Sequence, residues 1–138
     1  EMFATALRDL GTRRALVVHG SDGLDEITCT GPTRVSELRD GQVRTYELSA
    51  APLLGELCES ADMAGGDAAT NAAILRGVLE GKPGAPRNVA LLNAAAAIVA
   101  GEKADRIEDA LELAAEAVDS GSARQKLEVL IEETQHGA

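Results

Sequence analysis

The sequence RALVVHGSDGLDE occupies residues 14–26 and leads from an apolar run into a loop rich in glycine and carboxylates. Residues 15–18 are continuously apolar, which is typical of a parallel strand buried on both faces of a sheet. Asp22, Asp25 and Glu26 follow that run directly. Ligands of open α/β sheets bind beyond the carboxyl ends of the strands, so these carboxylates are candidates for a binding site.

An antiparallel hairpin is expected after this loop. Residues 33–38 and 43–48 have strand character, and between them lies Asp40-Gly41, a dipeptide that favours a tight hairpin turn. Residues 27–30 are also rich in β-formers. Before the apolar run, Phe3, Ala6, Leu7 and Leu10 recur at helical spacing, and Gly11 is suited to end that helix.

The rest of the chain has the composition of a helical bundle. Only five of the 25 Ala residues lie in residues 1–60, and twenty lie in residues 61–138. Residues 89–100 are apolar except for Asn93, which predicts a central buried helix whose one amide ties it to a neighbouring loop or strand.

Three further helices have start signals in the sequence. Asp67 is placed to cap a helix over residues 68–80. Asp105 with Glu108, and Ser122 with Gln125, have the spacing of capping boxes. The sequence therefore predicts an α/β fold with a short mixed sheet, an antiparallel hairpin and a mostly helical carboxyl-terminal half.

The acidic loop has two interpretations. Adjacent carboxylates can direct oxygen ligands at Mg²⁺, which takes one or two carboxylates and completes its octahedron with water and substrate phosphates. Alternatively, Asp22-Gly23 is an ordinary turn and the acids are solvated.

The other candidate site residues are interpreted as structural. His19 and Ser21 are sequence neighbours without a nucleophile motif, so His19 is interpreted as a structural histidine at a strand end. Gly65-Gly66 before Asp67 resembles an anion site, but the aspartate competes for the same N–H donors, which favours a plain helix cap.

The net charge of −10 argues against nucleic acid as a partner, because no basic stripe is present to displace counterions. Phe3 and Tyr46 are the only aromatic residues, so bases have no stacking platform and Tyr46 is interpreted as packing. The acids of residues 101–138 are interpreted as a solvated helical face.

Cys29 and Cys58 have neither metal-ligand spacing nor the pattern of a disulfide framework, which fits a reducing cytoplasm. No apolar run is long enough for a membrane span, and no secretory signal is recognisable at the N-terminus. We therefore expect a cytoplasmic protein without a membrane partner.

The stretch from residue 14 to residue 26 resembles the anthranilate phosphoribosyltransferase family. The resemblance continues in chain order, and its motifs are Gly65-Gly66-Asp67-Ala68 with Asn71, Leu79-Glu80-Gly81 with Gly84, Leu92-Asn93-Ala94-Ala95-Ala96, and Ala117-Val118-Asp119-Ser120-Gly121 with Ala123. It covers essentially the whole chain, and the HG-x-DGLDE stretch is its most specific part.

The resemblance implies transfer of the phosphoribosyl group from phosphoribosyl pyrophosphate to anthranilate in tryptophan biosynthesis, with release of pyrophosphate and a requirement for Mg²⁺. It also implies that Asp25 and Glu26 match the acidic pair that helps to hold Mg²⁺ against the pyrophosphate. The metal would neutralise charge on the leaving group.

The sequence also departs from the family pattern. The Gly-Thr-Gly-Gly-Asp phosphate cradle, the Lys-His-Gly-Asn stretch and the arginine that meets anthranilate have no counterpart in residues 1–138. By resemblance, residues 1–138 form the carboxyl-terminal part of the α/β phosphoribosyltransferase domain. The parent enzyme would be a homodimer through a helical domain absent here, and this part would be inactive alone.

Two other functions remain open. A pyrimidine nucleoside phosphorylase belongs to a related family with a similar layout and uses free phosphate. A non-catalytic paralogue or binding module is the alternative from a different class.

Overall fold

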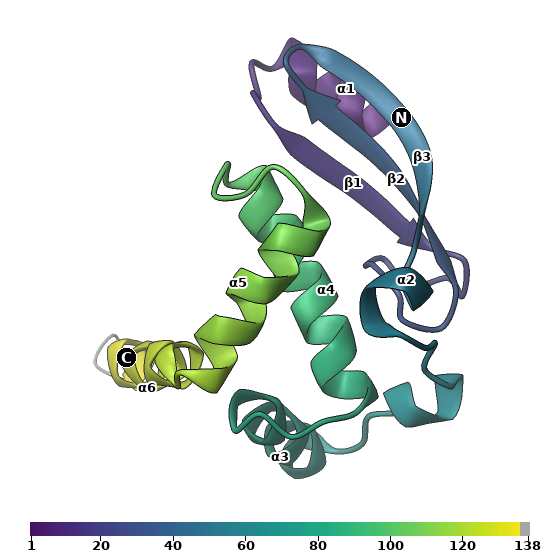
Figure 1. Cartoon of the computed structure of the whole chain (residues 1–138). Helices are drawn as coiled ribbons and strands as arrows, with labels where there is room; N and C mark the ends of the chain where they lie inside the picture. Colours follow the sequence, from purple (N-terminus) through teal and green to yellow (C-terminus); the bar gives the residue numbers. More distant parts are fainter. Residues whose placement is uncertain (136–138) are drawn as a thin grey trace.

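The computed structural model describes residues 1–135 and has an α/β fold in which a small sheet lies at one end of a group of helices (Figure 1). The elements, in chain order, are α1 (Met2–Asp9), β1 (Ala15–Gly20), β2 (Pro32–Arg39), β3 (Gln42–Ser49), α2 (Ala51–Leu54), the 3₁₀ helix η1 (Ser60–Met63), α3 (Ala68–Leu79), α4 (Ala85–Ala100), α5 (Ile107–Asp119) and α6 (Ser122–Gln135).

The sheet is antiparallel with strand order β1-β2-β3. The hairpin is confirmed: Arg39 pairs with Gln42, and both turn residues have positive φ, 51° at Asp40 and 75° at Gly41. This is the backbone that a two-residue turn of the primed type requires. The β-rich residues 27–30 do not join the sheet.

The expectation of a parallel strand is wrong for the pairing seen here, because β1 runs antiparallel to β2, with Val18 opposite Val35. Most of β1 is only half-buried, and its other edge has no strand partner among residues 1–135. Burial of the strand on both faces is therefore also not seen in residues 1–135, and the apolar run did not set the direction of the neighbouring strand.

α1 forms and ends at Asp9, just before Gly11, whose φ is 89°, but its buried side is not the predicted stripe. α1 lies against one face of the sheet (Figure 1) and buries Ala4 completely. Phe3 and Leu10 remain 77% and 83% exposed. A small residue faces the sheet because it permits close approach of the helix.

α4 is the central helix of the group, as expected, and lies between the sheet and the other long helices (Figure 1). Its buried residues, including Leu92 and Ala95, contribute to both apolar clusters of the core. It is not buried all round, since Ala90 and Ala97 are exposed. None of the helices described in residues 1–135 has the length and apolar character of a membrane span.

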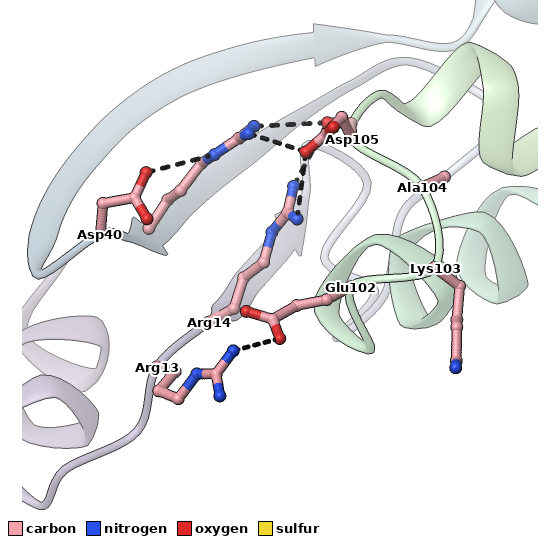
Figure 2. A pocket seen from close by; sticks show the side chains of 8 residues that line it. Arg13, Arg14, Asp40, Glu102, Lys103, Ala104 and Asp105 are labelled. Carbon is pink, nitrogen blue, oxygen red and sulfur yellow. Dashed lines mark hydrogen bonds and ion pairs between the residues drawn. The ribbon is translucent and has the colours of Figure 1, made fainter.

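The loop between α4 and α5 is fastened to the sheet by ion pairs (Figure 2). Arg39 reaches Asp105 at 2.7 Å, and Arg14, whose side chain is 7% exposed, approaches the same carboxylate at 3.6 Å. Arg13 pairs with Glu102. Asp105 therefore does not cap α5, contrary to the capping-box expectation, because arginines of the sheet take its carboxylate.

The expected capping box of Ser122 with Gln125 is also not formed as predicted. Ser122 is the first residue of α6, and the hydroxyl near its N–H belongs to Ser120, at 3.4 Å. The acids of residues 101–135 are all exposed, which confirms the solvated face.

Candidate metal site at the end of β1

The loop after β1 is closed by its own backbone. The N–H of Gly20 donates to the carbonyl of Leu24 at 2.9 Å, and the N–H of Gly23 donates to the carbonyl of Gly20 at 3.0 Å. Gly23 has φ of 92°, in the left-handed region that favours glycine. The chain therefore turns sharply within a few residues of the strand end.

Asp22 is exposed, but its carboxylate folds back onto the loop and stabilises it. One carboxylate oxygen accepts hydrogen bonds from the hydroxyls of Thr28 and Thr30, and the other accepts the N–H of Leu24 at 3.2 Å. These bonds, from Thr28 first and Thr30 second, lower the pKa of Asp22 below its usual value. A Cβ on Gly20 would lie 2.5 Å from an oxygen of the same carboxylate and would displace it, so glycine permits this fold-back.

Asn93 holds the far side of the loop from α4. Its Oδ1 accepts the N–H of Ile27 at 2.9 Å, and its Nδ2 donates to the carbonyls of Ile27 and Val89 at 2.9 and 3.0 Å. The prediction that this amide ties the helix to a loop is confirmed. Ile27 is 1% exposed, so without Asn93 its backbone groups would be buried without partners.

Asp25 and Glu26 lie between these two anchors. Asp25 is exposed and Glu26 is half-buried. Neither carboxylate makes a hydrogen bond or an ion pair with any side chain or backbone group described in residues 1–135. Their backbone is held from both sides while their oxygens remain available.

The structure separates the three carboxylates that the sequence places together. Asp22 is committed to two threonines, and within residues 1–135 no group of three or more His, Cys, Asp or Glu side chains is arranged to hold a metal ion. A three-carboxylate cluster is therefore wrong. The remaining pair fits Mg²⁺, which needs few protein ligands when water and phosphate oxygens supply the others.

Of the other candidates from the sequence, Asp67 has a structural role, and the structure defines no role for His19. Asp67 accepts the N–H of Thr70 at 2.8 Å, and Asn71 bonds both the N–H and the carbonyl of Gly66. The helix cap is confirmed, because Asp67 accepts the N–H of Thr70 at the start of α3. His19 is at the end of β1, exposed, and has no polar partner within residues 1–135.

Tyr46 packs within the sheet as expected. Its hydroxyl donates to Glu37 at 3.3 Å, and burial, followed by the charge of Glu37, raises its pKa to about 12.

Sequence reasoning missed the two threonines that hold Asp22. A Thr-x-Thr pattern six residues after an aspartate was the available signal, but such patterns are common, and only the folded loop shows which hydroxyls reach the carboxylate.

Residues 1–124 match the family described as "glycosyl transferase family, a/b domain". The chain belongs to this glycosyl transferase family. Within it, the similarity is to anthranilate phosphoribosyltransferases: the enzyme of that name from Syntrophobacter fumaroxidans is 54% identical over 134 residues, which cover 97% of this chain and 40% of the relative. The resemblance inferred from residues 14–26 is confirmed.

Solved structures support the same relationship. Anthranilate phosphoribosyltransferase from Thermus thermophilus superposes with a TM-score of 0.80 at 34% identity, over 91% of this chain and 36% of that one. The Saccharomyces cerevisiae enzyme in complex with PRPP and Mg superposes with a TM-score of 0.73 at 27% identity, over 83% and 33%. The chain spans about 40% of the length of the curated relative.

Proposed function

We propose that this chain is the carboxyl-terminal part, residues 1–138, of the α/β domain of an anthranilate phosphoribosyltransferase. The enzyme transfers the phosphoribosyl group of phosphoribosyl pyrophosphate to the amino group of anthranilate, gives N-(5-phosphoribosyl)anthranilate and pyrophosphate, and serves tryptophan biosynthesis in the cytoplasm. The observation that carries the proposal is the loop after β1, in which a fixed backbone presents two uncommitted carboxylates, in a chain 54% identical to an enzyme of this name.

Asp25 and Glu26 are the residues proposed to hold Mg²⁺. When bound, the metal supplies positive charge to the departing pyrophosphate and orients it. Asp22 and Asn93 position the two ligands, because each fixes the backbone on one side of them. The hard oxygen donors of this pair suit Mg²⁺ better than a soft or thiol-bound metal.

The distribution of charge supports the same assignment. Two adjacent carboxylates without a cationic partner repel each other and repel an anionic substrate in a chain of net charge −10. A divalent cation between the loop and a pyrophosphate removes both repulsions. The parent enzyme is proposed to be a homodimer through a domain outside residues 1–138, without nucleic acid or membrane partners.

The test is a substrate assay on the whole protein from which this chain derives. We expect consumption of anthranilate that requires both phosphoribosyl pyrophosphate and Mg²⁺ and that releases pyrophosphate. Phosphorolysis of a pyrimidine nucleoside with free phosphate would instead identify a nucleoside phosphorylase. Absence of both reactions in a folded protein would favour a binding module.

The 138 residues alone are expected to show no phosphoribosyl transfer, because they contain no Gly-Thr-Gly-Gly-Asp cradle for the substrate phosphates. Turnover by this chain in isolation, measured by pyrophosphate release, would contradict that division of the site.

A further inference from the structure

The fold brings the two cysteines together. The backbone N–H of Cys58 donates to the carbonyl oxygen of Cys29 at 2.8 Å, although the residues are far apart in the sequence. Cys29 is 0% exposed, and Cys58 packs against the same apolar cluster from a half-buried position. Both are free thiols.

The two side chains also border the same apolar cluster. Burial and the neighbouring Cys58 together raise the pKa of Cys29 to about 12. The Cys29 thiol also lies 3.5 Å from Sδ of Met63, so its immediate surroundings are sulfur and hydrocarbon.

The backbone spacing suits a covalent bond between the two residues. Antiparallel residues that share main-chain hydrogen bonds have Cα atoms about 5.5 Å apart, and disulfides span Cα separations of about 4.4–6.8 Å. The backbone hydrogen bond from Cys58 to Cys29, although outside the sheet, brings the two main chains into direct contact.

The two thiols differ in accessibility, which sets the order of reaction. Cys58 is half-buried, and Nδ2 of Asn88 lies 3.7 Å from its sulfur, where it can donate to a thiolate. Cys29 is closed to solvent. A reagent in solution therefore meets Cys58 first, and Cys29 can react only with Cys58.

We propose that Cys29 and Cys58 form an oxidisable dithiol, a modification site that a small-molecule disulfide such as oxidised glutathione converts to an intramolecular disulfide. The Cys58 sulfur attacks one sulfur of the reagent, and the other leaves as a thiol with the proton of Cys58. The Cys29 sulfur then attacks the mixed disulfide at Cys58, and the second thiol leaves with the proton of Cys29. The reagent gains two electrons, and the two cysteines lose them.

The bond would cross-link two segments beside the acidic loop. Cys29 follows Ile27, whose backbone Asn93 holds, and Cys58 lies between α2 and η1. Oxidation would therefore fasten the segment after Glu26 to the segment before η1. This proposal concerns the chemistry of the thiols and does not depend on the proposed enzymatic function.

The test is oxidation of the folded 138-residue chain with excess oxidised glutathione. We expect both thiols to be lost when they are titrated after denaturation, an intact mass lower by two hydrogen atoms, and a peptide map with one Cys29–Cys58 cross-link. The urea midpoint of unfolding is expected to rise, because the bond constrains the unfolded chain.

Two variants separate the steps. Cys29→Ser should stop at a glutathione adduct on Cys58, and Cys58→Ser should leave Cys29 unmodified while the chain is folded. The wild-type peptide map tests the proposal even if a variant fails to fold. A wild-type chain that retains glutathione on Cys58 with Cys29 free, that forms intermolecular dimers, or that keeps both thiols would overturn it.

Discussion

The carboxylates near the two ends of β1 differ in whether they have a cationic partner. Before the strand, Arg13 and Arg14 pair with Glu102 and Asp105, so these acids join the α4–α5 loop to the sheet (Figure 2). β1 has six residues and is therefore about 20 Å long. After its other end, Asp25 and Glu26 have no cationic partner within residues 1–135.

The comparison separates structural acids from candidate ligands. A paired carboxylate already has its countercharge, and its loss weakens packing. An unpaired one on a fixed backbone can take its countercharge from solution.

The largest effect is expected from Asp25→Asn combined with Glu26→Gln in the whole enzyme. If these residues bind Mg²⁺, kcat/KM should fall about 1,000-fold, because several kcal/mol of charge stabilisation are at stake. Unfolding by urea should change little, since neither side chain has a partner within residues 1–135.

The matched control is Glu132→Gln with Glu133→Gln, which removes the same charge from the exposed surface of α6. An equal loss of activity in both double variants would show that net charge, and not the acidic loop, accounts for the effect.

Asn93→Leu should cost about 2–3 kcal/mol in the free energy of unfolding, because it leaves the buried N–H and carbonyl of Ile27 without partners. Asn88→Leu is the control on the same helix, since the described contact of Asn88 is a weak one of 3.7 Å to sulfur. Urea unfolding followed by circular dichroism measures both, and equal losses would refute the assigned role of Asn93.

Arg14→Met should lower the free energy of unfolding by about 1–2 kcal/mol, and Arg13→Met should lower it by less than about 0.5 kcal/mol. The side chain of Arg14 is 7% exposed and approaches Asp105 and Glu37, whereas that of Arg13 is 80% exposed. Both changes keep an unbranched side chain, so thermal unfolding compares the charges. A larger cost at Arg13 would reverse this interpretation of Figure 2.

The smallest effect is a change in pH dependence with Asp22→Asn. The pKa of Asp22 is lower in the folded chain, so its ionisation stabilises the fold above the ordinary pKa of about 3.9. That contribution is lost as pH falls through the folded-state pKa. The variant should therefore lose less stability between about pH 5 and pH 2 than the wild type. Parallel stability curves for the two proteins would contradict this role of the carboxylate.

Local sequence signals predicted the elements that depend on local physics. The Asp40-Gly41 turn, the Asp67 cap and the Asn93 tie are all as expected, because a turn, a cap and a lone buried amide have few alternatives. The family resemblance, which rests on residues 14–26, is likewise confirmed by the relatives.

The errors lie where distant residues compete for the same group. Asp105 was expected to cap a helix, but two arginines of the sheet region take its carboxylate. Asp22 was grouped with the candidate ligands, but Thr28 and Thr30 take its oxygens. The contact of Cys58 with Cys29 also depends on tertiary structure and had no signal in the spacing.

The most direct test of the proposed site is binding of Mn²⁺, a paramagnetic substitute for Mg²⁺ with the same preference for oxygen ligands, to the whole enzyme in the presence of pyrophosphate. The proposal predicts that Asp25→Asn with Glu26→Gln weakens this binding at least about tenfold, while Glu132→Gln with Glu133→Gln leaves it unchanged. Equal Mn²⁺ affinity in the wild type and the loop variant would contradict the assignment of these two carboxylates as metal ligands.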